Sequence, residues 1–461
     1  MYLASLTGLL SIFVGLCCLL VKKIGRLAIL LLYPGIMFFQ YIANLATLDS
    51  GIFVYELGTT TRNIYSAQIY ITFLIIFLIF LILFCPQKIR MLEDPFTQGQ
   101  KMNIMKSFRQ FFALVIAGSL CLSAYVMFDM MVSGVPLLSD GYITHYNYFK
   151  DYSKLPFAGT ASNLLTFCAL LLGVYYAISD RHRTKCVAVI ATLVMLLCRI
   201  MLGFKMTGLI DVAIAFSVGA ILFGTNTSRL KTTGALRVIG TLVLLAAAFL
   251  ALYLNYVIRS GDAANLAQAF DLLTERIFGM GAHLWWAALA DQSNGFGFFP
   301  RSDEELLSPF TLMDEFDTGV GVYGMMLRYG NPVVVTADIA GGVRFTADFI
   351  TTAIFYNGYL LGSFVIISIA GLVAAFLRLF DKFVHNGEIA SFFIAYYLFV
   401  PFSTYFCATG TLTTFFNVKT YLVAFVLVFV SLLDYWAKAN SRRFIGNVPG
   451  SLKSHSNIEE A

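Results

Sequence analysis

The twenty residues 66–85 read SAQIYITFLIIFLIFLILFC and include no charged side chain. A helix rises about 1.5 Å per residue, so a stretch of this length crosses the hydrocarbon core of a bilayer, which is about 30 Å thick. The whole chain has the same character, because 59% of its 461 residues are hydrophobic and only 12% are charged. Soluble domains carry about twice that charged fraction. We therefore predict an all-α integral membrane protein.

Similar apolar runs recur along the chain and predict about eleven transmembrane helices. They lie at 3–21, 27–48, 66–85, 111–133, 160–179, 187–203, 208–224, 237–257, 347–377, 389–410 and 415–437. The predicted organisation has four parts, which are helices one to eight in 1–257, a large loop in 258–346, helices nine to eleven in 347–437 and a tail in 438–461.

Lysine and arginine residues collect in alternate connections between the predicted helices. Twenty of the 31 lie in these connections or in the tail: Lys22, Lys23, Arg26, Lys88, Arg90, Lys101, Lys106, Arg109, Arg181, Arg183, Lys185, Arg229, Lys231, Arg237, Arg378, Lys382, Lys438, Arg442, Arg443 and Lys453. Connections rich in lysine and arginine face the cytoplasm. We therefore predict that the N-terminus and the large loop lie outside and that the C-terminus is cytoplasmic.

The large loop is nearly ninety residues long and is rich in aromatic residues, glycine and short apolar segments. Loops of this length are usually either functional or disordered, and the apolar content favours a folded one. We expect it to be partly helical and to lie over the transmembrane bundle. One helix is expected over 266–290, where apolar side chains recur at helical spacing through Leu272, Ile277, Leu284 and Ala288.

All basic residues of the large loop are arginines. They are Arg259, Arg276, Arg301, Arg328 and Arg344. A guanidinium group is planar, stays charged and binds phosphate or carboxylate through two parallel hydrogen bonds. We expect at least one of these arginines to contact an anionic ligand. Because the loop also contains many acidic residues, ion pairs within the loop are the alternative role for each of them.

Three charged residues fall in or between two closely spaced predicted helices. Arg199 follows Leu196-Leu197-Cys198, and Lys205 and Asp211 follow across a short turn. A charge inside a membrane costs several kcal/mol unless it is paired or faces a polar cavity, so it marks a candidate functional site. Arg199 and Lys205 are predicted to bind substrate, because both lie toward the outer face. The alternatives are a structural pair of Arg199 with Asp211, or a Lys205 side chain that reaches to the interface.

His283 is the only histidine of the large loop, and Trp285 and Trp286 follow it closely. A neutral imidazole accepts a hydroxyl proton, so His283 is a candidate general base, with a role as an interfacial residue as the alternative. The other histidines are scattered without metal-ligand spacing, and no nucleotide-binding pattern is present. We predict no metal and no cofactor. The net charge of +5, without a basic block, argues against nucleic acid as a partner.

Three segments carry a resemblance to a known family. They are the loop Gly134-Val135-Pro136-Leu137-Leu138-Ser139, the basic turn from Arg199 to Gly208, and the arginine-bearing large loop followed by Asn357-Gly358-Tyr359-Leu360-Leu361-Gly362. Together they resemble the Wzy-type O-antigen and capsular polysaccharide polymerases of the O-antigen polymerase/ligase superfamily, over nearly the full chain. One departure is that the Arg-x10-Gly pattern of some members is absent after all five loop arginines.

The resemblance implies a GT-C-like membrane glycosyltransferase in the inner membrane of a bacterium. Such an enzyme transfers the growing glycan from undecaprenyl pyrophosphate to the next lipid-linked repeat unit at the periplasmic face. Its partners are undecaprenyl-pyrophosphate-linked oligosaccharide and membrane lipids, with a chain-length regulator as an open question. The alternatives are an O-antigen ligase and a lipid-linked oligosaccharide flippase or transporter.

The resemblance implies roles for two groups of residues. The substrate-binding residues are Arg199, Lys205, Arg259, Arg276, Arg328 and Arg344. Fixed cations at these positions stabilise the charge that develops on the pyrophosphate leaving group. The general base that accepts the hydroxyl proton is His283, Glu275 or Asp338, and the residues alone do not rank the three.

Overall fold

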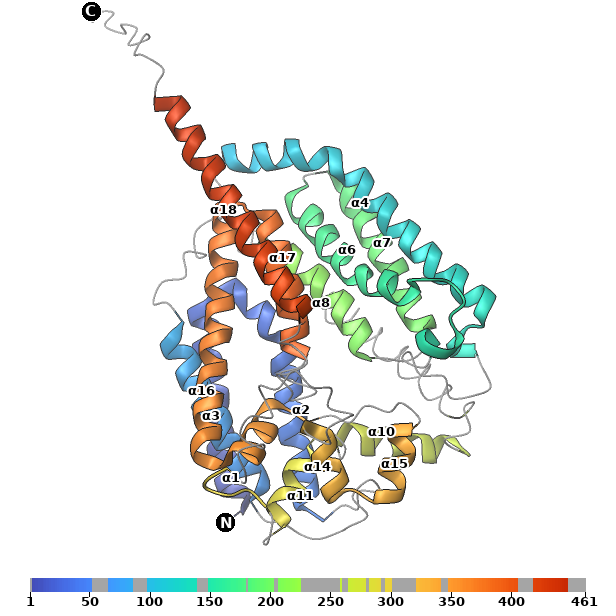
Figure 1. Ribbon diagram of the computed structural model, residues 1–461, viewed down its shortest axis with the longest axis vertical. Coiled ribbons are helices and arrows are strands. Elements are labelled where there is room, and N and C mark those ends of the chain that lie inside the picture. The colour runs from blue at the N-terminus through green and yellow to red at the C-terminus, as the bar shows by residue number, and fades with distance from the viewer. Residues whose placement is uncertain are drawn as a thin grey trace, which may run out of the picture.

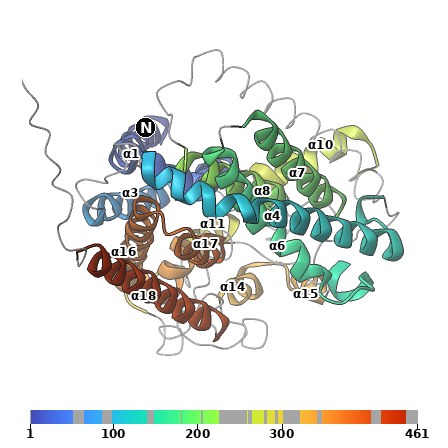
Figure 2. The ribbon, with the colours of Figure 1, turned by 90° about the horizontal axis from the view of Figure 1, so that it is seen from above.

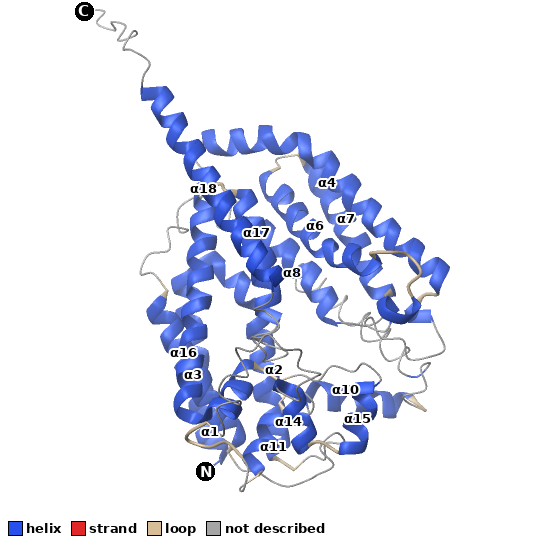
Figure 3. Ribbon diagram, in the orientation of Figure 1, coloured by secondary structure: helices blue, strands red, loops and turns tan. Residues whose placement is uncertain are grey.

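The computed structural model of the protein describes residues 2–51, 65–85, 98–138, 148–179, 181–202, 206–224, 258, 264–278, 282–291, 295–300, 321–340, 347–404 and 418–446. Every regular element in these residues is helical, as Figure 3 shows. The predicted all-α class is therefore confirmed.

Long helices form a bundle, and shorter ones lie at one of its ends (Figure 1). The bundle contains α1 (Tyr2–Ile24), η1 (Gly25–Leu31), α2 (Leu32–Asp49), α3 (Ser66–Phe84), α4 (Gln98–Ser133), α6 (Ala158–Ile178), α7 (His182–Met201), α8 (Met206–Leu222), α16 (Phe349–Asn386), α17 (Ile389–Thr404) and α18 (Val418–Gly446). The short helices α10 (Leu266–Phe278), α11 (His283–Ala290), α14 (Gly321–Tyr329) and α15 (Pro332–Ala340) are called the loop layer below.

Six described stretches are long and apolar enough to cross a membrane. They are Tyr2–Asp49, Ser66–Phe84, Phe111–Leu138, Ala158–Ile178, His182–Met201 and Phe349–Asn386. Three shorter apolar helices accompany them, at Asp211–Leu222, Ile389–Ser403 and Thr420–Leu433. The first stretch covers two predicted spans, because the 3-10 helix η1 joins α1 to α2 without a polar loop. The total of about eleven spans stays a prediction, and the span predicted at 237–257 lies outside the described residues.

Seen from above, α1, α3 and α16 lie on one side of the bundle and α6 and α7 on the other, with α8 and α17 between them (Figure 2). Hydrogen bonds from basic side chains join several helices at one end. Lys23 Nζ donates to the Ile82 carbonyl at 2.5 Å, Arg26 to the Gly224 carbonyl and Arg378 to the Phe84 carbonyl. We call this the basic end. The loop layer packs on α2, α3 and α16 at the opposite end.

Two glycines set the spacing between α6 and α8, the most extensively packed helix pair. A Cβ atom on Gly173 would lie 2.1 Å from the Phe216 carbonyl oxygen, and one on Gly219 would lie 2.3 Å from the Leu170 carbonyl oxygen. Small residues allow this close approach of helix backbones within membranes. On α6, Ser162 and Thr166 also accept hydrogen bonds from Arg199 on α7.

Gly173→Leu is expected to destabilise the protein by about 3 kcal/mol or more, because the side chain meets backbone that cannot rotate away. Thermal unfolding in detergent, followed by size-exclusion chromatography, measures the effect. The control is Gly118→Leu on α4, where a Cβ meets no heavy atom within 4 Å. Equal melting temperatures for the two variants would contradict the close approach of α6 and α8.

A positive backbone angle interrupts α16 at Gly358, which has φ 69° and ψ 176°. The break leaves two backbone N–H groups without acceptors in the helix. They donate instead to carbonyls of residues 295–300, the described segment that lies between α11 and α14 in the chain. Tyr359 N donates to the Gly297 carbonyl at 2.8 Å, and Leu360 N donates to the Phe298 carbonyl at 3.2 Å. A Cβ on Gly358 would lie 2.7 Å from Phe299 backbone, so only glycine fits here. This contact fixes the loop layer to the bundle.

The single helix predicted over 266–290 is wrong in detail, because α10 ends at Phe278 and α11 begins at His283. Ala282, just before α11, has non-helical φ and ψ of −121° and 14°. The intervening sequence contains Gly279 and Gly281, and glycine is a poor helix former. After the break, α11 packs on α2, α3 and α16.

Candidate functional site

Arg199 lies in the last turn of α7 and is 8% exposed. Its Nη2 atom donates to the Ser162 carbonyl at 2.6 Å and to Thr166 Oγ1 at 3.4 Å. Ser162 and Thr166 are four residues apart on α6, so they share one face of that helix. Arg199 is therefore held between the first half of α6 and the last turn of α7. These ends lie opposite the connection 179–181, where α6 ends and α7 begins.

Asp211 on α8 interacts electrostatically with Arg199. Its side chain also lines a cavity of about 20 Å³ together with Tyr33, Thr166, Tyr396 and Ser403. A cavity of this size holds about one water molecule and is too small for a phosphate group. The electrostatic interaction is consistent with the structural pair of Arg199 and Asp211, which stays one of the two predicted roles of Arg199.

Two polar groups of this site have unused hydrogen-bonding capacity within the described part of the chain. Arg199 Nε and Ser162 Oγ are both buried and have no hydrogen-bond partner there. Buried polar groups are nearly always paired in folded proteins, so such groups require an explanation. A guanidinium has five N–H donors, and a hydroxyl can donate as well as accept. Together they can bind a ligand that supplies acceptor oxygens.

A second polar cluster lies where the loop layer meets the bundle. The Asp49 carboxylate accepts from Ser66 Oγ at 2.6 Å and from the Tyr2 hydroxyl at 2.9 Å. Trp285 Nε1 on α11 donates to the Ser66 carbonyl at 3.0 Å. This cluster therefore joins α1, α2, α3 and the loop layer.

Asp348 forms a neighbouring part of this junction and is fully buried. It is the N-cap of α16, where Oδ1 accepts from Thr351 N at 2.9 Å and from Thr351 Oγ1 at 2.5 Å. Oδ2 accepts from the Tyr70 hydroxyl on α3. Asp49 and Asp348 are not among the site residues predicted from the sequence. An acidic residue directly before an apolar run, as at Asp348, is a recognisable N-cap signal.

His283 begins α11 and is 2% exposed. Its Nε2 atom lies 3.4 Å from Met326 Sδ on α14, so the imidazole packs between two helices of the loop layer. Trp285 and Trp286 are also buried, and the Trp285 ring meets Tyr70 edge-on at 5.5 Å. The role of His283 as general base stays a prediction.

Arg328 on α14 is exposed, and its guanidinium carbon lies 5.8 Å from the ring centres of both Tyr329 and Phe355. Aromatic faces attract a cation in this arrangement and orient it without using its hydrogen-bond donors. Arg328 is therefore available to a ligand at the surface of the loop layer.

The other predicted site residues are described in part or not at all. Glu275 and Arg276 lie on α10 and Asp338 lies on α15, but their side chains are outside the described residues. Lys205, Arg259 and Arg344 also lie outside the described residues. Arg199 contacts α6 in the bundle, whereas His283 and Arg328 belong to the loop layer. The predicted site residues are thus divided between two regions.

The described residues 148–155, between α4 and α6, are anchored by a buried carboxylate on α4. Asp129 accepts from the Tyr148 hydroxyl at 2.9 Å, from Ser153 Oγ at 2.8 Å and from Leu155 N at 3.0 Å. Burial, together with the bond to Asp129, raises the pKa of Tyr148, so its hydroxyl stays protonated and donates. These contacts give Tyr148 a structural role.

Residues 315–424 match the model of a family of unknown function, DUF6418. The match begins just before α14 and continues through α15, α16 and α17 into α18. It therefore includes half of the loop layer together with the kinked helix that holds it. No curated protein and no solved structure matches the chain.

Proposed function

We propose that this chain is a bacterial surface-polysaccharide polymerase. It transfers the growing glycan from undecaprenyl pyrophosphate to the next lipid-linked repeat unit, at the periplasmic face of the inner membrane. The observation that carries the proposal is the buried Arg199 beside Ser162, each with a polar atom that has no hydrogen-bond partner in the described residues. The resemblance of the sequence to Wzy-type polymerases supports the same activity.

The proposed reaction breaks the bond between the anomeric carbon and the pyrophosphate oxygen, and forms a bond from that carbon to the acceptor hydroxyl oxygen. The electron pair of the broken bond leaves with the pyrophosphate, which gains negative charge. A fixed guanidinium stabilises this charge more strongly in a low-dielectric site than in water. Arg199 is already oriented by Ser162 and Thr166, so little reorganisation accompanies the transfer.

The acceptor hydroxyl loses a proton in this reaction, and the proposed base is His283, Glu275 or Asp338. All three belong to helices of the loop layer. In the proposal this layer holds the acceptor sugar, and the exposed Arg328 contacts the phosphates of an incoming carrier. Holding both substrates in register is a large part of the catalysis, because it converts a bimolecular step into an effectively unimolecular one.

Deletion of the gene, beside a complemented control, tests the proposed function. Surface polysaccharide and lipid-linked sugars are separated on gels. A polymerase predicts loss of the long ladder while a single repeat unit still reaches the surface. Long chains that remain on undecaprenyl pyrophosphate would indicate an O-antigen ligase instead. Lipid-linked units confined to the inner leaflet would indicate a flippase.

Arg276→Ala is expected to abolish polymer formation at a normal level of the protein, because it removes a cation from the loop layer. The ladder on a polysaccharide gel and the amount of protein in the membrane are measured together. The matched control is Asp271→Ala, which removes an exposed charge from the same helix and should leave the ladder intact. Full-length polymer in the Arg276→Ala strain would remove Arg276 from the proposed site.

A further inference from the structure

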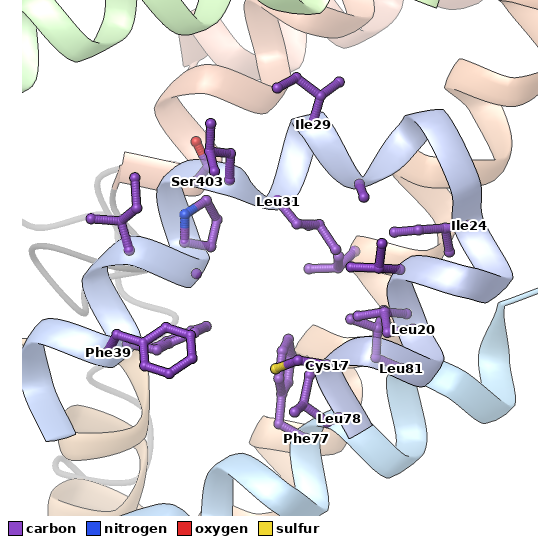
Figure 4. Close-up of a pocket in the computed structure, with 18 of the residues that line it drawn as sticks. Cys17, Leu20, Ile24, Ile29, Leu31, Phe39, Phe77, Leu78, Leu81 and Ser403 are labelled. Atoms are coloured by element: carbon purple, nitrogen blue, oxygen red, sulfur yellow. The ribbon is translucent and has the colours of Figure 1, made fainter. Parts of the chain in front are cut away.

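A deep apolar groove lies between α1, η1 and α2. Two of its lining residues, Phe399 and Ser403 on α17, also line the small cavity beside Asp211. Its volume is about 700 Å³, within the range of about 300–1,000 Å³ that ligand sites occupy. Figure 4 shows Leu20 from α1, Phe39 from α2, and Phe77 and Leu81 from α3 around a common space. Residues of α16 and α17 close its inner side.

The groove is open at the surface of the bundle. Four of its apolar residues are exposed, namely Val21 at 53%, Leu32 at 44%, Ile36 at 45% and Phe39 at 47%. They belong to Tyr2–Asp49, a stretch that is long and apolar enough to cross a membrane. In a bilayer the opening therefore faces hydrocarbon, and a lipid chain can enter sideways without leaving its leaflet.

The charge at one end of the groove is positive. Arg26 lines the groove where η1 crosses it, and none of the described lining residues is acidic. Lys22 and Lys23 lie in the last turn of α1, directly before this point, and Lys22 is exposed. Basic residues near the membrane surface attract anionic lipids. An amphiphile that fits both the groove and its end has an apolar chain and an anionic headgroup.

We propose that this groove binds one acyl chain of an anionic phospholipid from the leaflet at the basic end, with the headgroup phosphate beside Lys22 and Arg26. The chain fills the space between α1 and α2 and contacts α3. This inference does not depend on the proposed polymerase activity, because Lys22, Arg26 and the residues of α1, η1 and α2 that line the groove belong neither to the Arg199 site nor to the loop layer.

Gly35 on α2 offers a way to fill the groove. It lines the groove, and a Cβ atom added there meets no heavy atom within 4 Å. Gly35→Trp is therefore expected to place an indole in the space of the acyl chain, from a Cβ position that is open. Gly118→Trp is the matched control, because Gly118 lies on α4, outside the groove, and its Cβ position is equally open.

The experiment is native mass spectrometry of the full chain released from bilayers of equal parts phosphatidylglycerol and phosphatidylcholine with added polyprenyl phosphate. The wild type and Gly118→Trp are expected to retain one phosphatidylglycerol. Gly35→Trp is expected to retain about tenfold less, which corresponds to about 1.4 kcal/mol of binding free energy. Lys22→Glu, a change of an exposed residue, should reduce the preference for phosphatidylglycerol over phosphatidylcholine.

Three results would overturn the inference. Equal retention by Gly35→Trp and Gly118→Trp would show that lipid does not occupy the groove. Equal retention of both phospholipids by the wild type would contradict the role of the basic residues. Displacement of phospholipid by polyprenyl phosphate, lost in Gly35→Trp, would assign the groove to an isoprenoid chain.

Discussion

Arg199→Ala is expected to lower polymer formation by a factor of about 10² to 10³, the loss that follows removal of one fixed donor from a developing negative charge. The guanidinium is held by the Ser162 carbonyl and by Thr166, so its position depends on α6 and not on substrate. The measurement is the polysaccharide ladder, normalised to the amount of protein in the membrane. A ladder at the wild-type level would remove Arg199 from the proposed mechanism.

Arg378→Ala is the matched control for this variant. Arg378 also donates to a helix carbonyl, that of Phe84, but it lies at the basic end of the bundle. Loss of this bond is expected to leave the ladder intact. If both arginine variants lost the ladder equally, the effect would reflect assembly of the helices and not the chemistry of the Arg199 site.

A double variant distinguishes two roles of Arg199, which are binding of an anionic substrate and neutralisation of the Asp211 charge. Removal of Arg199 alone takes away a positive charge that stabilises the Asp211 carboxylate, and removal of one member of a buried charge pair is destabilising. Arg199→Met combined with Asp211→Asn removes both charges. We expect the double variant to regain thermal stability and to remain inactive. Restored polymer in the double variant would show that Arg199 serves only as a structural partner.

The helical bundle was largely predictable because membrane-spanning helices depend on composition over about 20 residues. The runs at 66–85 and 160–179 agree with α3 and α6 within a few residues. Details that depend on single contacts were not predictable. The kink at Gly358 requires knowledge that the backbone of Phe298 and Phe299 lies against it, and these residues are about sixty positions away in the chain.

The candidate site was predictable only in its charged members. Arg199 and Asp211 are conspicuous in an apolar sequence, because charges there are rare. Ser162 and Thr166 are not, since serine and threonine are common in membrane helices and bond to their own backbone. Whether Ser162 Oγ faces Arg199 or lipid depends on the rotation of α6, which its packing against α8 determines.

Asp348→Ala is expected to lower the free energy of unfolding by about 3 kcal/mol or more. The change removes the N-cap of α16 and leaves the Thr351 amide and the Tyr70 hydroxyl without their acceptor in a fully buried place. Thermal unfolding in detergent measures the loss. Asp348→Asn is the control, because asparagine is an equally good N-cap and the Tyr70 hydroxyl can accept as well as donate.

The effect of Asp348→Ala should extend to the loop layer. Tyr70 packs edge-on against Trp285 of α11, and Trp285 donates to the Ser66 carbonyl. Because Asp348 accepts the Tyr70 hydroxyl, it also supports the packing of α11 on α3. Limited proteolysis is therefore expected to cleave Asp348→Ala near α11 faster than the wild type or Asp348→Asn. If Asp348→Ala were destabilised but equally protected near α11, the carboxylate would only cap α16. In that case the Asp49 cluster and the contact between 295–300 and α16 would hold the loop layer on the bundle.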